Sequence, residues 1–341
     1  MPETIALSLD SIYQLAYQAM CDNGADHDNA DALANTIFTA ERDGSVSHGL
    51  FRMPAYIKSL KSGKVKGNAS PTVSTPTASI VKCHGDNGFA PIVQRVAIPH
   101  LITAAKNQGV AVLAMTHTHH MAALWPEVEA LANENLAGLA CVSYMPMVAP
   151  SGAGKAFFGT NPIAFAWPRP GKHPMVFDMA TASMAMGEVQ VAKREGHSVP
   201  EGTGLDADGN PTTDPAAISD GGVLLPFGGH KGSAIAMMVE LLAGGLIGEA
   251  FSYEARERDN GDGGPPQGGQ FILALNPEML AGAGWADHSD AFFDRLTSLG
   301  DVRLPGARRF INRQNKDARH INKALIDTIC ADIKDPSAIL A

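Results

Sequence analysis

The sequence predicts a mixed α/β protein with a substantial core, and three observations support that class. Helical and strand-like hydrophobic patterns are interleaved along the chain, with no internal repeat. The 341 residues are 45% hydrophobic and 18% charged, which is typical of a globular protein long enough for two domains. The 35 glycines and 22 prolines are dispersed, which indicates many tight connections rather than low complexity. This pattern leaves the order of the strands open.

The first third of the chain carries four helical patterns. Ser8 or Asp10 can cap the first helix. A polar, glycine-flanked break over 43–49 follows the second, and Pro99 should bend the fourth. The four helices are expected over 11–20, over 28–42, through Tyr56 and Leu60, and over 91–107.

From Gly109 onward, strand and helix patterns alternate. The β-branched and apolar run 110–116 predicts a buried strand. The apolar segment 232–248 is too short to span a bilayer and contains Glu240, so we interpret it as a buried helix. Strands are expected at 110–116, 137–144, 163–167, 175–179 and 271–275, and helices at 126–135, 186–195, 231–246, 287–298 and 323–334.

Charge and cysteine usage exclude several classes of function. The formal net charge is −9 and no block of Lys and Arg occurs, so we expect no nucleic-acid partner. The four cysteines lack CxxC spacing, which is typical of reduced thiols in the cytosol. The N-terminus lacks a basic stretch followed by an apolar one, so we expect no signal peptide, no membrane association and a cytoplasmic location.

Familiar nucleotide and metal motifs are missing from the sequence. No G-x-G-x-x-G follows a predicted strand, so the usual dinucleotide-binding fold has no support. The segment 151–155, SGAGK, lacks the spacing of a phosphate loop. The histidine-rich segment 116–120, THTHH, has no HExxH pattern or cysteine partners, so we favour a loop that packs a cofactor or substrate over a metal site.

Two short segments could carry chemistry. His48 can deliver a proton near neutral pH, and Arg52, one helical turn later, can bind a carboxylate through two hydrogen bonds. A loop Ser-His pair followed by a surface arginine is the competing interpretation. The segment 228–232, GGHKG, opens an apolar helix, and its backbone amides and Lys231 could bind phosphate, although a simple helix start is equally compatible with it.

The order of these segments resembles the malate/L-lactate dehydrogenase family of non-Rossmann NAD(P)-dependent oxidoreductases. The resemblance covers nearly the whole chain and implies an unusual α/β fold with a cofactor-binding sheet domain and a helical domain. The segments that carry it are ERDGSVSHGLFRMPAY (41–56), HTHHMAALWPEVEALA (117–132), FGTNPIAFAWP (158–168), FDMATASMAMGEVQVAKREG (177–196), LPFGGHKGSAIAMMVELLAGGL (225–246) and RLPGARR (303–309).

One variation favours a particular branch of this family. Hydroxy-acid dehydrogenases usually continue the histidine loop with a glycine- and tyrosine-rich turn, whereas this chain reads ALWPEVE over 123–129. That version resembles the reductases of cyclic imino acids, which convert Δ1-pyrroline-2-carboxylate to L-proline and Δ1-piperideine-2-carboxylate to L-pipecolate with NADPH. Hydroxyproline and lysine breakdown both produce such imines. The alternative is a 2-keto acid or 2-hydroxy acid dehydrogenase of malate, lactate, ureidoglycolate or diketogulonate type.

The resemblance also implies roles for individual residues. His48 corresponds to the proton donor, oriented by Ser47 and Glu188, where relatives often have Asp instead of Glu. Arg52 and Thr160 correspond to the contacts of the substrate carboxylate. The residues expected at the cofactor are His120, Met121, Ala122, Ala123, Leu124, Asp178, Met179, Ala180, Met186, Gly187, His230, Lys231, Arg303, Leu304, Pro305, Gly306, Ala307, Arg308 and Arg309.

The expected domain division and assembly follow from the same likeness. Residues 1–75 together with 310–341 should form the helical, substrate-side domain, and 76–309 the NADP-binding α/β domain with an inserted helical part. Members of the family are typically homodimers. The cations Arg303, Arg308 and Arg309 favour NADPH over NADH, because a 2′-phosphate requires at least one of them. We expect no metal ion.

Overall fold

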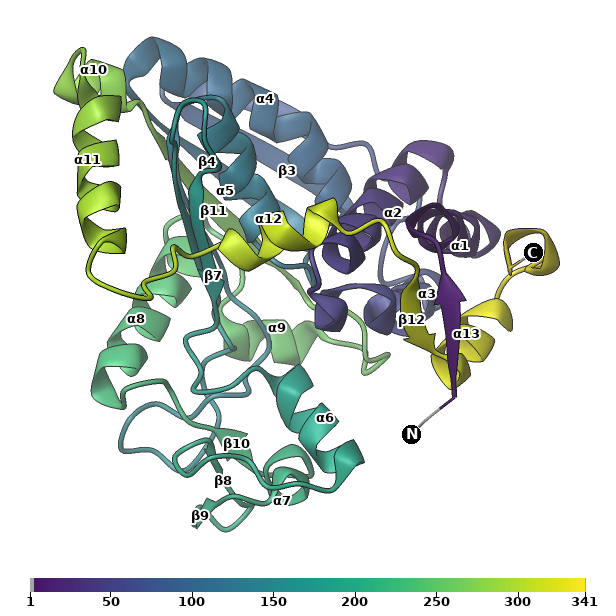
Figure 1. The fold of residues 1–341 in the computed structure, drawn as a ribbon. Coiled ribbons are helices and arrows are strands. Elements are labelled where there is room, and N and C mark those ends of the chain that lie inside the picture. Colours follow the sequence, from purple (N-terminus) through teal and green to yellow (C-terminus); the bar gives the residue numbers. More distant parts are fainter. Residues whose placement is uncertain (1–2, 341) are drawn as a thin grey trace.

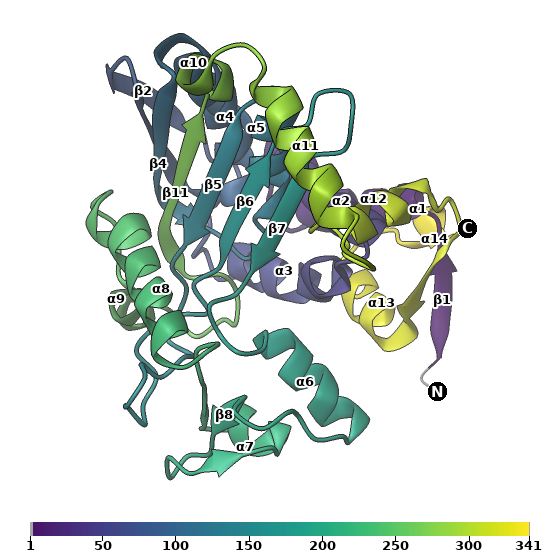
Figure 2. The same ribbon diagram turned by 60° about the vertical axis from the view of Figure 1, so that its left-hand side comes forward.

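The computed structural model describes residues 3–340 and contains a seven-stranded sheet at its centre (Figures 1 and 2). The strand order is β2-β3-β4-β11-β5-β6-β7. Only β3 and β4 run parallel; the other neighbours are antiparallel. The strands are β2 (Thr72–Thr77), β3 (Ile80–Phe89), β4 (Val110–His119), β5 (Ala137–Val142), β6 (Ile163–Trp167), β7 (Met175–Met179) and β11 (Gln267–Leu275).

Helices α4 (Ala90–Gln108) and α5 (Trp125–Asn133) cover one face of this sheet (Figure 1). Their buried side chains form the largest core with the inward side chains of the strands, among them Val81, Leu113 and Ile272. Helix α8 (His230–Glu240) and the π-helical turn that continues it, Leu241–Gly245, pack on the opposite face against Cys141 and Phe271. Burial of alternating apolar side chains on both faces explains why the central strands are almost continuously hydrophobic.

A helical body is built from both ends of the chain (Figure 1). Its apolar core joins residues from Leu7 to Val65 with Ile321, Ile326, Ile329 and Ile333. Strand β2 begins at Thr72 and already belongs to the central sheet. The elements of this body are β1 (Thr4–Leu7), α1 (Leu9–Asp22), α2 (His27–Arg42), the 3₁₀ turns η1 (Val46–His48) and η2 (Leu50–Arg52), α3 (Met53–Lys61), β12 (Arg319–Asn322), α13 (Lys323–Cys330) and α14 (Ser337–Leu340).

A small lobe and several outer helices complete the fold. The lobe has its own core, which includes Val148, Val189, Ile218 and Leu224. It consists of α6 (Met186–Glu195), α7 (Pro215–Ser219), β8 (Gly204–Leu205), β9 (Pro211–Thr212) and β10 (Val223–Leu224). The outer helices are α9 (Ser252–Arg258), α10 (Pro277–Ala281), α11 (Trp285–Thr297) and α12 (Ala307–Gln314).

The segment expected to be a fully buried helix differs from that prediction. Although its Val239 and Ala243 are buried, Leu241 is 55% exposed and Leu246 is 64% exposed. The helix therefore packs with one side only, and a methyl group on Gly244 or Gly245 would lie 3.1 or 3.2 Å from the Phe251 ring, a tight contact. Among residues 3–340, no helix combines the length and apolar character that crossing a membrane requires.

Candidate active site

Ser47, His48 and Arg52 lie on the two consecutive 3₁₀ turns η1 and η2. The Ser47 Oγ lies 3.1 Å from His48 Nδ1, and Arg52 Nε donates a hydrogen bond of 2.8 Å to the Ser47 carbonyl oxygen. All three side chains are half-buried. The residues that the sequence selected as proton donor and carboxylate contact therefore share one small, internally bonded unit.

The electrostatic surroundings hold His48 neutral in the ligand-free protein. Burial lowers the pKa of His48 to about 3, and the positive charge of Arg52 and the neighbouring His120 lower it further in the same direction. An anion bound at Arg52 would offset one of these causes. Binding of an anion at Arg52 would therefore make the imidazole more basic.

Two tyrosines that the sequence reasoning missed lie in the field of Arg52. Burial raises the pKa of Tyr56 and of Tyr144, and the Arg52 charge opposes the rise at both. Tyr56 is 1% exposed and packs edge-on against the Phe89 ring at 4.9 Å. Both are neutral phenols at neutral pH, so each can offer a hydroxyl group beside a bound anion. The position of Tyr144 at the end of a predicted strand does not indicate this role in the sequence.

Thr160 lies beside Tyr144 because the two chain segments are tightly joined. Asn161 Oδ1 accepts a hydrogen bond from the Tyr144 backbone N–H at 3.3 Å. A methyl group on Gly159 would lie only 2.4 Å from the Tyr144 carbonyl oxygen, which requires glycine there. The Thr160 carbonyl oxygen accepts bonds from the backbone N–H of Thr181 at 2.9 Å and from its hydroxyl at 3.1 Å.

Helix α6 brings Gly187 to the turns that carry Ser47 and Arg52 but leaves Glu188 exposed. A methyl group built on Gly187 would lie 3.6 Å from Ser47 Cβ and 4.0 Å from Arg52 Nη2. Glu188 is the next residue, in the first turn of the helix. Within the described part of the chain, it makes no hydrogen bond to Ser47 or His48. The orienting role expected for Glu188 remains a prediction.

The histidine loop is fixed by buried carboxylates. Asp178 Oδ2 accepts hydrogen bonds from the backbone N–H groups of Leu124, at 2.7 Å, and Trp125, at 3.1 Å. Burial raises the pKa of Asp178 to about 6, and the nearby Glu127 adds to the rise. His120 Nε2 lies 3.5 Å from Glu127 Oε1. The segments 120–124 and 178–180 therefore adjoin, as the cofactor prediction requires.

Arg309 adds a cation to this group. Its guanidinium lies 5.2 Å from the centre of the Trp125 ring, and Nη2 donates to the Val176 carbonyl oxygen at 2.7 Å. Its Nε is buried without a hydrogen-bond partner among the described residues. Arg303 and Arg308 are exposed nearby in the sequence. These donors suit the phosphates of a nicotinamide dinucleotide.

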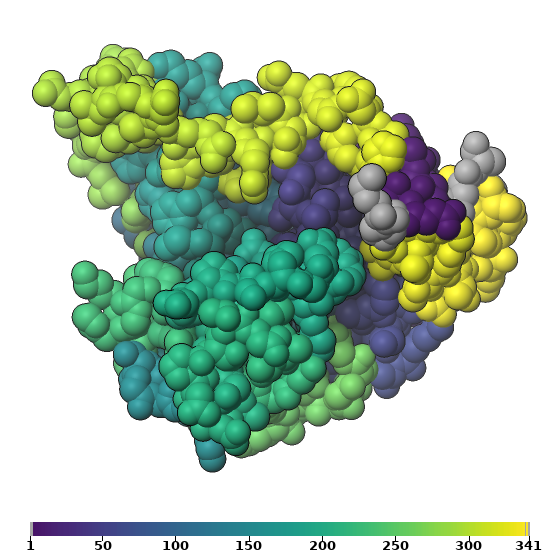
Figure 3. All heavy atoms as spheres, turned by 60° about the horizontal axis from the view of Figure 1, so that its bottom comes forward, coloured from purple at the N-terminus to yellow at the C-terminus, as the bar shows by residue number. Residues whose placement is uncertain are grey.

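The start of helix α8 approaches from the small lobe. The Phe227 backbone N–H donates to the Thr181 carbonyl oxygen at 3.0 Å, which places the 225–231 segment beside 178–181. Gly228 and Gly229 have φ of +57° and +62°, a conformation that favours glycine, and His230 and Lys231 after them are exposed. Figure 3 shows a hollow between the lobe, in green, and the yellow C-terminal segment, with purple N-terminal atoms at its back.

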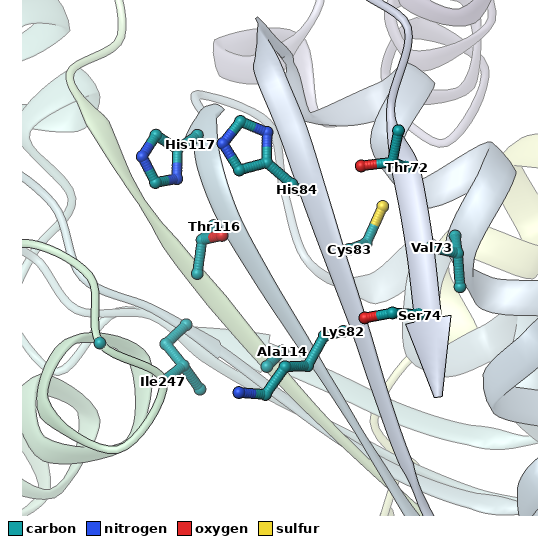
Figure 4. Close-up of a pocket in the computed structure, with 11 residues that line it drawn as sticks. Thr72, Val73, Ser74, Lys82, Cys83, His84, Ala114, Thr116, His117 and Ile247 are labelled. Atoms are coloured by element: carbon teal, nitrogen blue, oxygen red, sulfur yellow. The ribbon is translucent and has the colours of Figure 1, made fainter. Parts of the chain in front are cut away.

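The histidines of the histidine-rich segment do not converge within the described residues. His117, His119 and His120 contact different partners: Glu249, the Pro265 carbonyl oxygen and Glu127. Over residues 3–340, no three His, Cys, Asp or Glu side chains gather as metal ligands. His117 instead stacks on His84 at 4.2 Å and lines a cavity of about 450 Å³ on the outer strands (Figure 4). This cavity lies apart from His48 and Arg52.

The fold and these side chains define a class: an α/β protein in which an imidazole and a guanidinium share one bonded unit, with exposed cations at Lys231, Arg303 and Arg308. The chain belongs to the malate/L-lactate dehydrogenase family, whose model matches residues 7–330. This confirms the family and the fold class predicted from the sequence. Members of this family are oxidoreductases, and the family implies a nicotinamide cofactor.

Several characterised proteins are similar to this chain. The Δ1-pyrroline-2-carboxylate/Δ1-piperideine-2-carboxylate reductase of Pseudomonas syringae pv. tomato is 45% identical over 95% of this chain and 94% of its own. The corresponding reductase of Pseudomonas putida is 47% identical over 90% and 89%. A crystal structure of the P. syringae piperideine-2-carboxylate reductase superposes with a TM-score of 0.91 at 43% identity, covering 96% of this chain and all of that one.

Proposed function

We propose that this protein reduces cyclic imino acids, namely Δ1-pyrroline-2-carboxylate to L-proline and Δ1-piperideine-2-carboxylate to L-pipecolate, with NADPH. The observation that carries the proposal is the single turn that joins His48 to Arg52 in a protein 40–47% identical to several reductases of these imines. Such a substrate is small, flat and anionic at one end. It matches a site with one guanidinium for the carboxylate, on Arg52, and one imidazole for proton transfer, on His48.

The residues of the site divide the work of binding and proton transfer. Arg52 and Thr160 hold the carboxylate and so orient C2 for reaction, and orientation of this kind can lower a barrier by several kcal/mol. Bound NADPH supplies the hydride that adds to C2. His48 donates or shares a proton with the imine nitrogen, which makes C2 more electrophilic. Ser47 orients the imidazole through Nδ1, and we propose that Glu188 contributes to this orientation.

The binding of an anionic substrate prepares the acid. Burial and, after it, the charge of Arg52 lower the pKa of His48 in the free protein. A carboxylate paired with Arg52 removes much of that repulsion, so the imidazole binds a proton more readily when the substrate is present. The same carboxylate therefore serves both orientation and proton supply.

The cofactor groove is proposed to consist of the segments 120–124, 178–180, 186–187, 230–231 and 303–309. Asp178 fixes the proposed groove through the Leu124 backbone N–H, and Arg309 through the Val176 carbonyl oxygen. The side chains that are exposed and can reach phosphates are Arg303, Arg308 and Lys231. A preference for NADPH over NADH follows from these cations, because the 2′-phosphate adds a doubly charged group.

A steady-state assay tests the proposal. The purified protein is compared on both cyclic imines, pyruvate and oxaloacetate, each with NADPH and with NADH. We expect the highest kcat/KM with a cyclic imine and NADPH. A clear preference for a 2-keto acid would overturn the imine proposal and favour the alternative within the same family.

We further propose a cytoplasmic homodimer that uses the exposed side of helix α8. Met237 is 52% exposed and Leu241 is 55% exposed on this side, an apolar surface of the kind that interfaces cover. A second copy of the chain is the proposed occupant. Light scattering after size-exclusion chromatography should give twice the mass of 35.8 kDa, and Leu241→Glu should lower it toward that of one chain.

The division into a helical domain of 1–75 with 310–341 and an NADP-binding domain of 76–309 also stays a proposal. It is supported by the helical core that residues from both chain ends share. Limited proteolysis with and without NADPH tests it, since protection should extend over the 76–309 part.

A further inference from the structure

A buried carboxylate lies directly behind the turn that carries His48 and Arg52. Glu41, at the end of helix α2, is 2% exposed. Its Oε1 accepts a hydrogen bond of 2.8 Å from the backbone N–H of Leu50. Its Oε2 is buried and has no hydrogen-bond partner within the described part of the chain. An ionisable group in such a place costs stability, so its presence calls for a specific role.

The hydrogen bond of Glu41 closes the turn η2. The residue before this turn is Gly49, which has no side chain to cap it. Glu41 therefore supplies from a distance the acceptor that a capping residue would supply locally. Leu50 stands between His48 and Arg52, so this one bond fixes the backbone midway between the proton donor and the carboxylate clamp.

The packing around the carboxylate is close. A methyl group on Gly49 would lie 2.1 Å from Glu41 Oε1 and 2.5 Å from its Cδ, so glycine at 49 leaves the space that the carboxylate fills. The two residues occupy one volume between helix α2 and the turn. A change at either residue must therefore displace the other or shift the turn.

Two arginines of the C-terminal segment bind the end of helix α2 that carries Glu41. Arg319 Nε donates to the Glu41 carbonyl oxygen at 3.3 Å, and Arg313 pairs with Asp43. The charged or titratable groups around Glu41 are Arg42 and Asp43 on its own helix end, His48 and Arg52 on the turn, Arg313 on α12 and Arg319 on β12. Burial raises the pKa of Glu41 to about 7, although the Leu50 bond and Arg319 oppose the rise.

We propose that Glu41 is a positioning residue for the reaction: it holds the His48–Arg52 turn in its working geometry through the backbone N–H of Leu50. The inference rests on the proposed function of that turn. It assigns to Glu41 no contact with substrate or cofactor. The ionised carboxylate is the stronger acceptor for Leu50, so the turn is held more firmly when Glu41 is charged.

Three variants test this role: Glu41→Ala, Glu41→Gln and Gly49→Ala. Glu41→Ala removes the acceptor and should lower kcat/KM by about tenfold, through both kcat and KM, with unchanged NADPH affinity. Glu41→Gln keeps an acceptor oxygen and should restore most of this loss at pH 6. Gly49→Ala should also lower kcat/KM. The fold-loss in kcat/KM should be smaller in the Glu41→Ala background, because the methyl group has room there.

The pH dependence separates positioning from general structural damage. The ratio of kcat/KM for wild type to that for Glu41→Gln cancels the titration of the substrate. It should lie near one at pH 6 and rise by about threefold to tenfold above pH 8, as the charged carboxylate outperforms the amide. Glu257→Gln, an exposed change, is the matched control and should give a flat ratio.

Two outcomes would overturn the proposal. One is full activity of Glu41→Ala, and the other is a flat pH ratio together with simple additivity of the Glu41 and Gly49 changes. The substrate preference of the wild type is measured separately. A wild type that prefers 2-keto acids would refute the imine proposal and leave the Glu41 test valid on that substrate.

Discussion

The guanidinium of Arg52 is bonded to the backbone of Ser47, with 2.8 Å between Arg52 Nε and the Ser47 carbonyl oxygen. The side chain of Ser47 in turn contacts His48. The proposed carboxylate clamp and the proposed proton donor are thus parts of one small unit. A displacement of this unit moves both groups together, so their spacing is preserved. Substitutions at either position can be interpreted against this shared geometry.

Replacing His48 with alanine removes the proposed acid. We expect kcat to fall by a factor on the order of 10² to 10⁴, as loss of a general acid usually causes, with NADPH affinity nearly unchanged. Steady-state kinetics with a cyclic imine and fluorescence titration of NADPH measure the two effects. The exposed His100→Ala variant is the control. Normal turnover in His48→Ala would place the acid elsewhere, with His120 as the next candidate.

Replacing Arg52 with lysine keeps the charge but loses the planar fork. Lysine cannot bind both oxygens of a carboxylate while it also keeps the bond to the Ser47 carbonyl oxygen. The KM for the imine should rise by about tenfold or more, and kcat should fall less. Arg194→Lys, on the exposed side of α6, should change neither value. An unaltered KM in Arg52→Lys would argue against the carboxylate role.

Anion binding at Arg52 should be linked to proton uptake by His48. The pKa of His48 is lowered to about 3 in the free protein, so a carboxylate at Arg52 should raise it. Pyrrole-2-carboxylate is a flat, non-reducible probe of suitable size. Calorimetry at pH 5 to 6 in buffers of different ionisation enthalpy should show uptake of a fraction of a proton on binding. The His48→Gln variant should show none, and equal heats in all buffers for the wild type would contradict the linkage.

The same lowered pKa affects stability at acidic pH. The imidazole of the unfolded chain takes up a proton near pH 6.5, whereas the folded chain does so only near pH 3. The contribution of His48 to the free energy of unfolding therefore falls as the pH drops from 6.5 toward 3. The His48→Gln variant lacks this effect, so its unfolding free energy relative to wild type should be greater at pH 4.5 than at pH 7.5, as denaturant titrations can measure.

The exposed arginines Arg303, before helix α12, and Arg308, in its first turn, should select the cofactor. Replacing Arg303 and Arg308 together with serine removes two cations available to a 2′-phosphate. The KM for NADPH should rise by about tenfold or more, and the KM for NADH should change little. Replacement of Arg295, on the neighbouring helix α11, is the control. Equal losses with both cofactors would show that these arginines do not read the 2′-phosphate.

Much of the fold was predictable because many segments are bounded by residues that typically begin or end helices and strands. Strands β6 and β7 and helix α6 have the same bounds in the sequence prediction and the structure. Strands β2 and β3 were missed because TVSTPT contains proline and polar residues and HGDNG resembles a turn. Asp86 and Asn87 do adopt left-handed φ of 52° and 57°, but the irregularity interrupts the strand without ending it.

Some residues of the candidate site could likewise be predicted from the sequence, and others could not. His48 and Arg52 could be selected because one helical turn separates them, and the family resemblance gave their roles. Tyr144 could not be selected, because it meets the site only through the packing of a distant segment. Glu41 lies only nine residues before Leu50, but its spacing does not show that its carboxylate turns back to the Leu50 N–H. Periodicity reports which face of an element is buried, but it does not report which buried polar group faces another.

The pairing of Arg313 and Arg319 with the end of helix α2 has a consequence for synthesis. Both arginines follow residue 310, whereas the turn they brace begins before residue 50. During synthesis, His48 and Arg52 are therefore made long before the supports of their turn. A nascent chain should remain inactive until Arg313 and Arg319 have emerged, and a stop codon before Arg313 should yield protein that cannot complete its own active site.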